Sequence, residues 1–323
     1  MRPPAHAVSA AETGKKRFLW VSLVTALALL LLLVLTAAGL TKAMADRYNS
    51  SVTKINRAFP SSDERPPFPE RGEQTVLLLS SHYDDTVVSY PSAEVGQWSS
   101  IHLVRFPASR EAVYVISIPA GLTVTTKDGE RTQLSETKAL GGTKQTVTAV
   151  ENLLGARINK LAIVRDNALP TAASALGVSG AAGEHPENGF GCEISQKEQV
   201  LMGAIASELS TPGALLRPQQ TFALIDALGD GAHTSKDLSF RFIARMFLES
   251  GGFGGTKVNF LTVPTVWELF ETQPGQESLA LVPEHEGLLD LRLALADDDL
   301  SDLAGDPMFA PCGQPYEMND SVS

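Results

Sequence analysis

The chain has 323 residues, a formal net charge of −11 and two cysteines. A nucleic-acid-binding protein would need a basic patch or stripe, and the acidic sequence contains none. Two distant cysteines also provide too few ligands for a structural zinc site. The composition therefore predicts neither a nucleic-acid partner nor a bound metal, and the length allows one large domain or two small ones.

An uncharged apolar run lies near the N-terminus, FLWVSLVTALALLLLLVLTAAG at residues 18–39. As a helix it would be roughly 33 Å long, against about 30 Å for the hydrocarbon core of a bilayer. We therefore predict a transmembrane helix over residues 18–40, after a cytoplasmic segment 1–17. A cleaved signal peptide is the alternative, because Ala43-Met44-Ala45 fits a cleavage site, but secretory apolar regions usually span only about 7–15 residues. The cluster Lys15-Lys16-Arg17 favours a cytoplasmic N-terminus and an extracytoplasmic main domain in the cell membrane.

Residues 41–73 are predicted to form a juxtamembrane helix followed by an extended, Pro-rich linker, SSDERPPFPERGE at 61–73. The main domain is predicted at 74–297. An irregular acidic tail follows at 298–323, whose aspartates we expect to be solvated. Cys192 and Cys312 are predicted to pair, because disulfides persist in oxidising extracytoplasmic compartments.

Short apolar runs alternate with helical periodicity along the main domain. Strands are predicted at 75–81, 101–106, 113–118, 161–164 and 258–263, and helices at 143–154, 169–176, 194–209, 221–228, 238–248 and 287–296. This alternation predicts an α/β fold with a mixed central sheet and helices on both faces.

Ligands of α/β folds bind beyond the carboxyl ends of the strands. The first predicted strand is followed by His82, Asp84 and Asp85, which could bind a metal or transfer protons. A polar strand-end loop is the simpler interpretation of these residues. The sequence contains no G-x-S-x-G elbow, no P-loop and no dinucleotide-binding fingerprint.

The strand LLLSS (77–81), then IHLVRFPASREAVYVISIP (101–119), then KALGGTKQTVTAVENLLG (138–155), resemble in their order and spacing the LytR–CpsA–Psr (LCP) family of cell-envelope proteins. The resemblance covers about residues 74–270. It implies an LCP-like fold and the transfer of glycopolymers from polyprenyl pyrophosphate to peptidoglycan. It further implies that arginines hold the pyrophosphate, that aspartates hold Mg²⁺ or act as base, and that the polyprenyl tail occupies an apolar pocket.

This chain departs from the family at the positions that carry chemistry. The positions that match family arginines and aspartates, or lie within those motifs, are His82, Asp84, Ser99, Ala120, Gly121, Glu193 and Gln196. Each lost charge-assisted hydrogen bond removes roughly 1.5–3 kcal/mol, so losing four would weaken pyrophosphate binding by many orders of magnitude. Arg165 and Lys197 could compensate only in part. We therefore expect no intact catalytic set, no cofactor and no bound Mg²⁺.

These substitutions favour a non-catalytic, membrane-anchored protein of cell-envelope biogenesis that binds a partner protein or a polyprenyl lipid. The ligand-binding residues would then come from His82, Asp84, Asp85, Arg165 and Lys197. One alternative is an active phosphotransferase with a site rebuilt from His82, Asp84 and Asp85. Another is a structural envelope assembly protein without a ligand.

Overall fold

The computed structural model describes residues 38–81, 97–126, 129–178, 192–211, 217–252, 257–273 and 276–310. The chain divides into two compact units, Met1–Asp46 and Arg47–Ser323. In the first unit, residues 38–46 are helical, and Lys42 and Asp46 form an ion pair of 2.6 Å one turn apart. The transmembrane helix predicted at 18–40 lies almost entirely outside the described residues. Within them, no helix is long and apolar enough to span a membrane.

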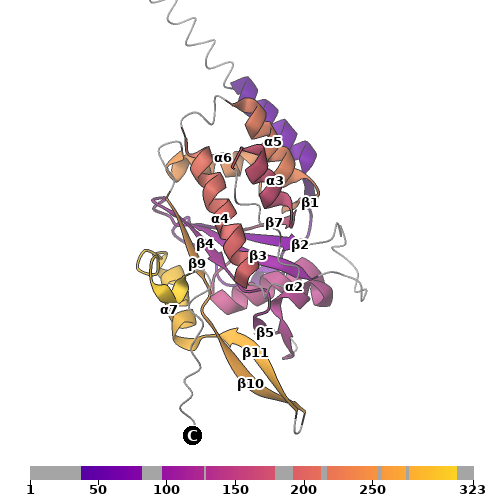
Figure 1. The fold of residues 1–323 in the computed structure, drawn as a ribbon, viewed down its shortest axis with the longest axis vertical. Coiled ribbons are helices and arrows are strands. Elements are labelled where there is room, and N and C mark those ends of the chain that lie inside the picture. The colour runs from indigo at the N-terminus through magenta and orange to yellow at the C-terminus, as the bar shows by residue number, and fades with distance from the viewer. Residues whose placement is uncertain are drawn as a thin grey trace, which may run out of the picture. The chain divides into compact units, whose positions relative to one another are not determined.

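Seven strands of the second unit form one mixed sheet in the order β1-β8-β7-β2-β3-β4-β9 (Figure 1). Their bounds are β1 Thr53–Ile55, β2 Gln74–Ser81, β3 Trp98–Phe106, β4 Val113–Ser117, β7 Lys160–Arg165, β8 His233–Ser235 and β9 Val258–Thr262. β2 pairs in parallel with β7, and β4 pairs in parallel with β9, whereas β3 is antiparallel to both β2 and β4. The carboxyl ends of β2, β4, β7 and β9 therefore meet at one edge of the sheet.

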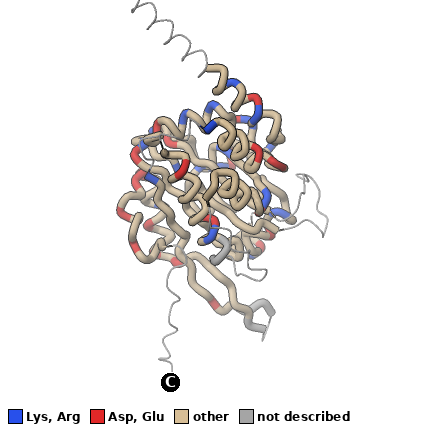
Figure 2. The backbone as a smooth tube through the Cα atoms, turned by 45° about the horizontal axis from the view of Figure 1, so that its top comes forward, with Lys and Arg blue, Asp and Glu red and all other residues tan. Residues whose placement is uncertain are grey.

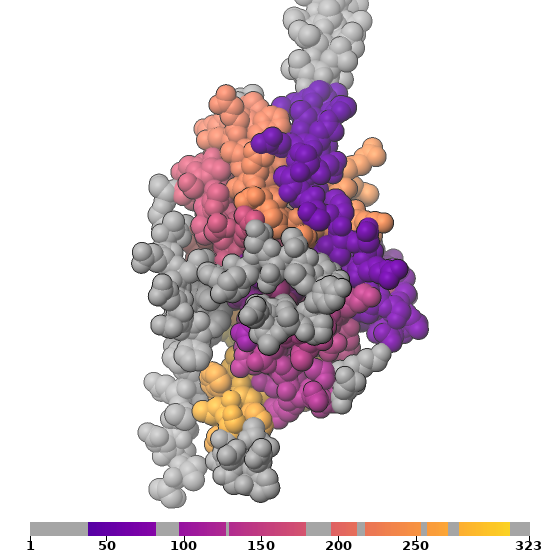
Figure 3. All heavy atoms as spheres, turned by 90° about the vertical axis from the view of Figure 1, so that its right-hand side faces the viewer, coloured from indigo at the N-terminus to yellow at the C-terminus, as the bar shows by residue number. Residues whose placement is uncertain are grey.

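Helices cover both faces of this sheet, as the sequence predicts. They are α2 Thr137–Leu154, α3 Ala168–Ala175, α4 Cys192–Leu209, α5 Pro218–Gly229, α6 Phe240–Glu249 and α7 His285–Asp297. On one face, Val150 of α2 and Leu291 of α7 pack into a core with Leu103 of β3. The two helices contact each other, and Figure 3 shows the yellow residues of the C-terminal part beside the magenta ones. On the other side, α3, α4 and α5 share a second apolar cluster.

Two small antiparallel hairpins are absent from the sequence prediction. One joins β5 Thr123–Thr125 to β6 Arg131–Gln133, and the other joins β10 Thr265–Gln273 to β11 Gln276–Pro283. An isolated bridge between Leu122 and Leu281 connects β11 to the segment that precedes β5. The β10–β11 hairpin projects away from the central sheet in Figure 1.

A helix ends at Ser51, within the range 41–73 where a juxtamembrane helix and a linker are predicted, and β1 then pairs with β8. The stretch 61–73, predicted to be an extended linker, contacts the domain. Arg65 binds Glu151 of α2 at 2.7 Å, and the two side chains are only 8% and 2% exposed. A Pro-rich, charged composition predicts a solvated linker. It cannot reveal that Arg65 binds a buried carboxylate far away in the sequence.

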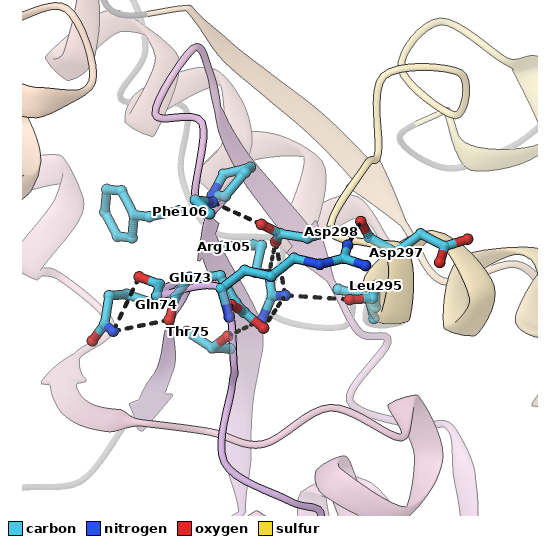
Figure 4. A network of polar contacts seen from close by, with 12 residues as sticks. Glu73, Gln74, Thr75, Arg105, Phe106, Leu295, Asp297 and Asp298 are labelled. Atoms are coloured by element: carbon cyan, nitrogen blue, oxygen red, sulfur yellow. Dashed lines mark hydrogen bonds and ion pairs between the residues drawn. The ribbon is translucent and has the colours of Figure 1, made fainter.

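The acidic residues that follow α7 are also partly buried, in contrast to the solvated tail predicted at 298–323. Asp298 lies 2.8 Å from the Arg105 guanidinium of β3, and its second carboxylate oxygen accepts a bond from the Ala108 amide. The same guanidinium lies 3.4 Å from Glu73 and donates to Thr75, as Figure 4 shows. Residues 298–310 therefore belong to the domain, while 311–323 lie outside the described residues.

Candidate functional site

Polar side chains gather at the sheet edge where the parallel strands end. Ser80 and Ser81 close β2, and Ser81 lies opposite both Trp98 of β3 and Arg165 of β7. Ser80 is paired in register with Ser100 of β3. Ligands of α/β folds bind at this edge, so these polar residues form the candidate site.

His102 lies at the centre of the polar contacts. It follows Ser100 by two residues on β3, so it lies further inside the sheet than the edge residues. His102 Nδ1 is 2.8 Å from Ser117 Oγ, and His102 Nε2 is 2.6 Å from Glu198 Oε2. The exposed fractions of His102, Ser117 and Glu198 are 0, 0 and 1%. A neutral imidazole protonated on Nε2 satisfies both contacts, because an ionised carboxylate only accepts and the serine hydroxyl can donate to Nδ1.

The order serine, histidine, glutamate also occurs in nucleophilic hydrolases. Here Ser117 Oγ is fully buried and also accepts a bond of 2.6 Å from Gln199 Nε2. A substrate carbonyl cannot reach an oxygen that is enclosed on all sides, so these residues hold α4 against β3 and β4 and do not form a hydrolase site.

A second branch links this triplet to the strand edge. Ser80 Oγ donates to Glu198 Oε1 at 3.3 Å and also contacts Ser100 Oγ. Ser99 Oγ lies 3.3 Å from Ser80 Oγ and hydrogen bonds to Asp166 Oδ1. We call this set the buried polar network; its members are Ser80, Ser99, Ser100, His102, Ser117, Asp166, Glu198 and Gln199.

Lys138 is a cation at this edge that sequence reasoning did not select. Its Nζ donates to Ser81 Oγ at 2.6 Å and lies 5.0 Å from the centre of the Trp98 ring, and the residue is 7% exposed. Trp98 is fixed in turn, because its Nε1 donates to Thr146 of α2 at 2.8 Å. Lys138 belongs to the first turn of α2, which the kink at Gly141 and Gly142 separates from the rest of the helix. No sequence pattern distinguishes it from an exposed lysine.

Several predicted site residues fall outside this description. His82, Asp84 and Asp85 lie in the stretch 82–96, and the side chain of Glu193 is likewise outside the described residues. Cys312 is outside them as well, so the pairing of Cys192 with Cys312 stays a prediction.

The other predicted positions are distributed around the edge. Ser99 belongs to the buried polar network. Ala120 is buried in the turn after β4, where its carbonyl accepts a bond of 2.8 Å from Ser135, and Gly121 is partly exposed. Arg165 forms an ion pair of 2.8 Å with Asp230, so its guanidinium is engaged with the loop after α5. Lys197 is partly exposed and Gln196 is exposed on α4.

The face of α4 that meets the sheet carries Ser195, Glu198 and Gln199, which are 4, 1 and 3% exposed, whereas Gln196 is exposed. The three buried residues follow one another at i, i+3 and i+4, so they share one side of the helix. They bring a serine, a glutamate and a glutamine to the sheet, and no arginine.

The same face of the sheet carries an apolar surface below the buried polar network. Leu78, Val104 and Phe260, which we call the apolar sheet face, alternate with residues that point to the α2 and α7 side. All three remain partly exposed, whereas Leu77 and Leu103 on the opposite face are 0% exposed.

Helices border this surface at two places. A Cβ on Gly203 of α4 would lie 3.2 Å from the Phe260 ring, so the helix backbone approaches that ring closely. Phe242 of α6 meets Phe106, two residues beyond Val104, edge to face at 6.5 Å. The apolar sheet face is therefore bordered by α4 at Phe260 and by α6 beyond Val104.

The described residues do not fit the Mg²⁺ site that the family resemblance implies. Magnesium is usually held by one or two carboxylates together with substrate phosphates. Ser99, which the resemblance matches to a metal-binding aspartate, has a hydroxyl in place of a carboxylate, and this hydroxyl is hydrogen bonded to Asp166. Glu198 is occupied by His102 and Ser80. Among the described residues, no group of three or more His, Cys, Asp or Glu side chains could hold a metal ion.

No protein-family model matches the chain, and no curated protein matches it in sequence. Solved structures do match its fold. B. subtilis TagV superimposes with a TM-score of 0.53 at 15% identity, over 71% of this chain and 98% of TagV. The chain has the LCP fold. A structure of TagT bound to LI-WTA gives 0.51 at 13% identity, covering 76% and 98% of the two chains. Protein gbs0355 from Streptococcus agalactiae gives 0.51 at 12% identity, covering 70% and 87%.

At sequence identities this low, the superpositions show that the backbones agree. They do not show that the side chains carry out the same chemistry. The agreement extends over nearly the full length of TagV. The fold expected from the segments 77–81, 101–119 and 138–155 is confirmed.

Proposed function

We propose that this chain is a membrane-anchored, extracytoplasmic protein of cell-envelope biogenesis that keeps the LCP scaffold but lacks its phosphotransfer activity. The apolar run 18–40 would supply the anchor, with the N-terminus in the cytoplasm. A structure of TagT, which has the same fold, contains bound LI-WTA. This supports the proposal that the present chain acts in cell-envelope biogenesis.

The observation that carries the loss of activity is the composition of the strand edge. Where a pyrophosphate would need positive charge, the buried polar network presents the carboxylates of Glu198 and Asp166. Like charges within a few ångströms disfavour each other strongly in a buried site. Glu198 also holds His102 and Ser80, so it cannot turn away without leaving buried donors unpaired.

The nearby cations do not rebuild a pyrophosphate clamp. The Lys138 ammonium is directed at Ser81 and the Trp98 ring, and the Arg165 guanidinium binds Asp230. A clamp for two phosphates relies on several bidentate arginine contacts aimed at one point. These two side chains come from α2 and the end of β7 and are held by different partners. They therefore do not converge on one point, as the clamp for a pyrophosphate transfer would require.

The ligand we propose is the apolar chain of a polyprenyl lipid, bound along the apolar sheet face. Partly exposed apolar side chains inside a domain, bordered by helices, are typical of small-molecule sites. Each 100 Å² of apolar surface covered would contribute about 2.5 kcal/mol. A partner protein could use such a lipid-loaded domain as a carrier or a sensor.

Lipid retention tests this function directly. The purified full chain is incubated with a polyprenyl phosphate and with a polyprenyl pyrophosphate, and lipid that co-elutes on gel filtration is quantified by mass spectrometry. We expect both lipids to be retained and the pyrophosphate to be recovered intact. Gly203→Leu, which adds bulk against Phe260, should reduce retention about tenfold, whereas Val200→Leu on the exposed side of α4 should not.

Three results would overturn parts of the proposal. Equal retention by the Gly203→Leu and Val200→Leu proteins would remove the apolar sheet face as the binding surface. No retention of either lipid would favour a structural envelope protein without a ligand. Cleavage of the pyrophosphate that is lost in His82→Ala would favour the rebuilt active site with His82, Asp84 and Asp85.

A further inference from the structure

The β10–β11 hairpin exposes three large apolar side chains on one face. Trp267, Leu269 and Leu279 are 59, 66 and 61% exposed. The register pairs Leu269 with Leu279 and Trp267 with Leu281, so these side chains share one face of the ribbon. Single exposed apolar residues are common on protein surfaces, but a contiguous group of this size marks an interaction site.

The opposite face anchors the hairpin to the domain. Ala280 and Val282 are buried there, and the Arg131 guanidinium of β6 lies 4.6 Å from the centre of the Phe270 ring. The bridge between Leu122 and Leu281 fixes β11 from its side. The exposed apolar face is therefore held in a defined orientation.

β10 presents an open edge. The ribbon contains β10 and β11 only, so among the described residues β10 has no strand on its other side. An open edge offers unpaired amide and carbonyl groups to an added strand. This property favours the addition of a third strand along β10.

The charge of the ribbon restricts what can be added. The stretch 265–283 contains Glu268, Glu271 and Glu277 and no lysine or arginine; Figure 2 shows acidic and no basic colour on the described part of the ribbon. Glu268 is exposed, and the register pairs Glu271 with Glu277. A second copy that paired edge to edge would bring like charges together, and an anionic membrane surface would be repelled.

We propose that the β10 edge receives an extended segment of a partner protein in which apolar residues alternate with lysine or arginine. Its apolar side chains would cover Trp267 and Leu269, and its basic side chains would reach Glu268 on the other face, because side chains alternate along a strand. This interaction is independent of the proposed lipid binding, since it uses neither the apolar sheet face nor the buried polar network.

A synthetic probe tests the proposal without knowledge of the natural partner. The full chain, in nanodiscs of zwitterionic lipid, is titrated into a fluorescent capped peptide of alternating valine and lysine that is as long as β10. Fluorescence anisotropy should report saturable binding at one peptide per chain. A peptide of alternating valine and glutamate should not bind. Replacing every second valine by proline should abolish binding, because proline cannot donate to the ladder.

Matched variants locate the site. Leu269→Ser and Glu268→Lys should each weaken binding about tenfold or more. The controls Leu248→Ser, at an equally exposed leucine of α6, and Glu70→Lys, at an exposed glutamate before β2, should bind like the parent protein. Circular dichroism confirms that each variant is folded. Leu269 and Glu268 are both exposed, so their replacement should leave the fold intact.

Four results would overturn the proposal. They are the absence of saturable binding, equal binding by Glu268→Lys and the parent protein, equal binding of the valine–glutamate peptide, and equal losses in the Leu248→Ser control. Concentration-dependent dimers that Leu269→Ser abolishes would assign the face to a second copy. Binding of protein-free anionic vesicles that requires Trp267 would assign it to a membrane surface.

Discussion

Glu198→Leu isolates the contribution of the buried polar network to stability. The substitution keeps a side chain of similar size on α4 but removes the carboxylate that accepts from His102 Nε2 at 2.6 Å and from Ser80 Oγ at 3.3 Å. Glu198 is 1% exposed, so water cannot replace the lost acceptor. The unfolded chain is hardly affected, because there all three side chains are hydrated.

The expected cost follows from the donors left behind. The imidazole N–H would be buried without an acceptor, which costs about 1–3 kcal/mol, and the Ser80 hydroxyl would keep only its contact with Ser100. Burial of the leucine side chain offsets part of this loss. We therefore expect the free energy of unfolding to fall by about 2–3 kcal/mol.

The double variant His102→Leu/Glu198→Leu separates pairing from burial. Replacing both partners by apolar groups removes the unpaired donor, so the double change should cost less than the sum of the single changes by at least 1 kcal/mol or so. Residues 47–323 suit this measurement, because they form one compact unit that contains the apolar clusters on both sides of the sheet. Urea unfolding followed by circular dichroism gives each free energy.

Additivity would refute this account. If the single changes sum to the double change within about 0.3–0.5 kcal/mol, His102 and Glu198 are not coupled. A neutral Glu198→Leu variant would likewise show that the network does not fix α4. A partly exposed glutamate on the same helix supplies the control: Glu208→Leu should change stability by less than about 0.5 kcal/mol, because it loses only a surface ion pair with Arg217.

Three further predictions concern other parts of the domain, and urea unfolding checks each. Arg105→Met should destabilise by about 3–5 kcal/mol, because it leaves Asp298 buried without its ion pair, and an Arg105→Met/Asp298→Asn double change should recover part of that loss. Gly142→Ala should cost about 1–3 kcal/mol, because Gly142 has φ 63° and ψ −152° at the kink of α2. Burial lowers the pKa of Lys160 below its usual 10.5. Just below pH 10.5 the unfolded chain therefore binds more protons than the folded chain, so the free energy of unfolding should rise with pH in this window. Lys160→Met should remove this rise.

Local patterns were enough to predict most of the central sheet and its helices. The apolar runs at 75–81 and 113–118 form β2 and β4 within one residue of their expected ends. Gly155, which directly follows the helix predicted at 143–154, has φ 65°, the left-handed conformation that ends α2. These elements are specified by residues close together in the sequence, so they could be predicted without knowledge of tertiary contacts.

The two hairpins and the boundaries of the domain were harder to predict from the sequence than the central sheet. The stretch TVWELFETQPGQESLALVP carries the alternation and the Pro-Gly turn of a hairpin, a signal that was available but not used. The packing of Arg65 on Glu151 and of Arg105 on Asp298 joins residues far apart in the chain. Composition alone makes such segments look solvated.

The candidate site was predicted only in part. Ser99 lies at the expected edge, and Gln196 is exposed on α4, while the buried face of that helix carries Ser195, Glu198 and Gln199. In sequence, Ser195, Glu198 and Gln199 resemble the solvent-facing side of an amphipathic helix, and only the polar face of the sheet, with His102 and Ser117, explains their burial. Because His102 and Glu198 are 96 residues apart, no local pattern connects them.

The central claim is that this LCP scaffold does not transfer phosphoryl groups. The most direct measurement incubates the full chain with a polyprenyl-pyrophosphate-linked glycan, peptidoglycan and Mg²⁺, and quantifies released polyprenyl phosphate by mass spectrometry beside an LCP enzyme of demonstrated activity. Our account predicts no product above the protein-free background, although the intact lipid remains bound to the protein. Turnover that depends on the protein and rises with its concentration would contradict it.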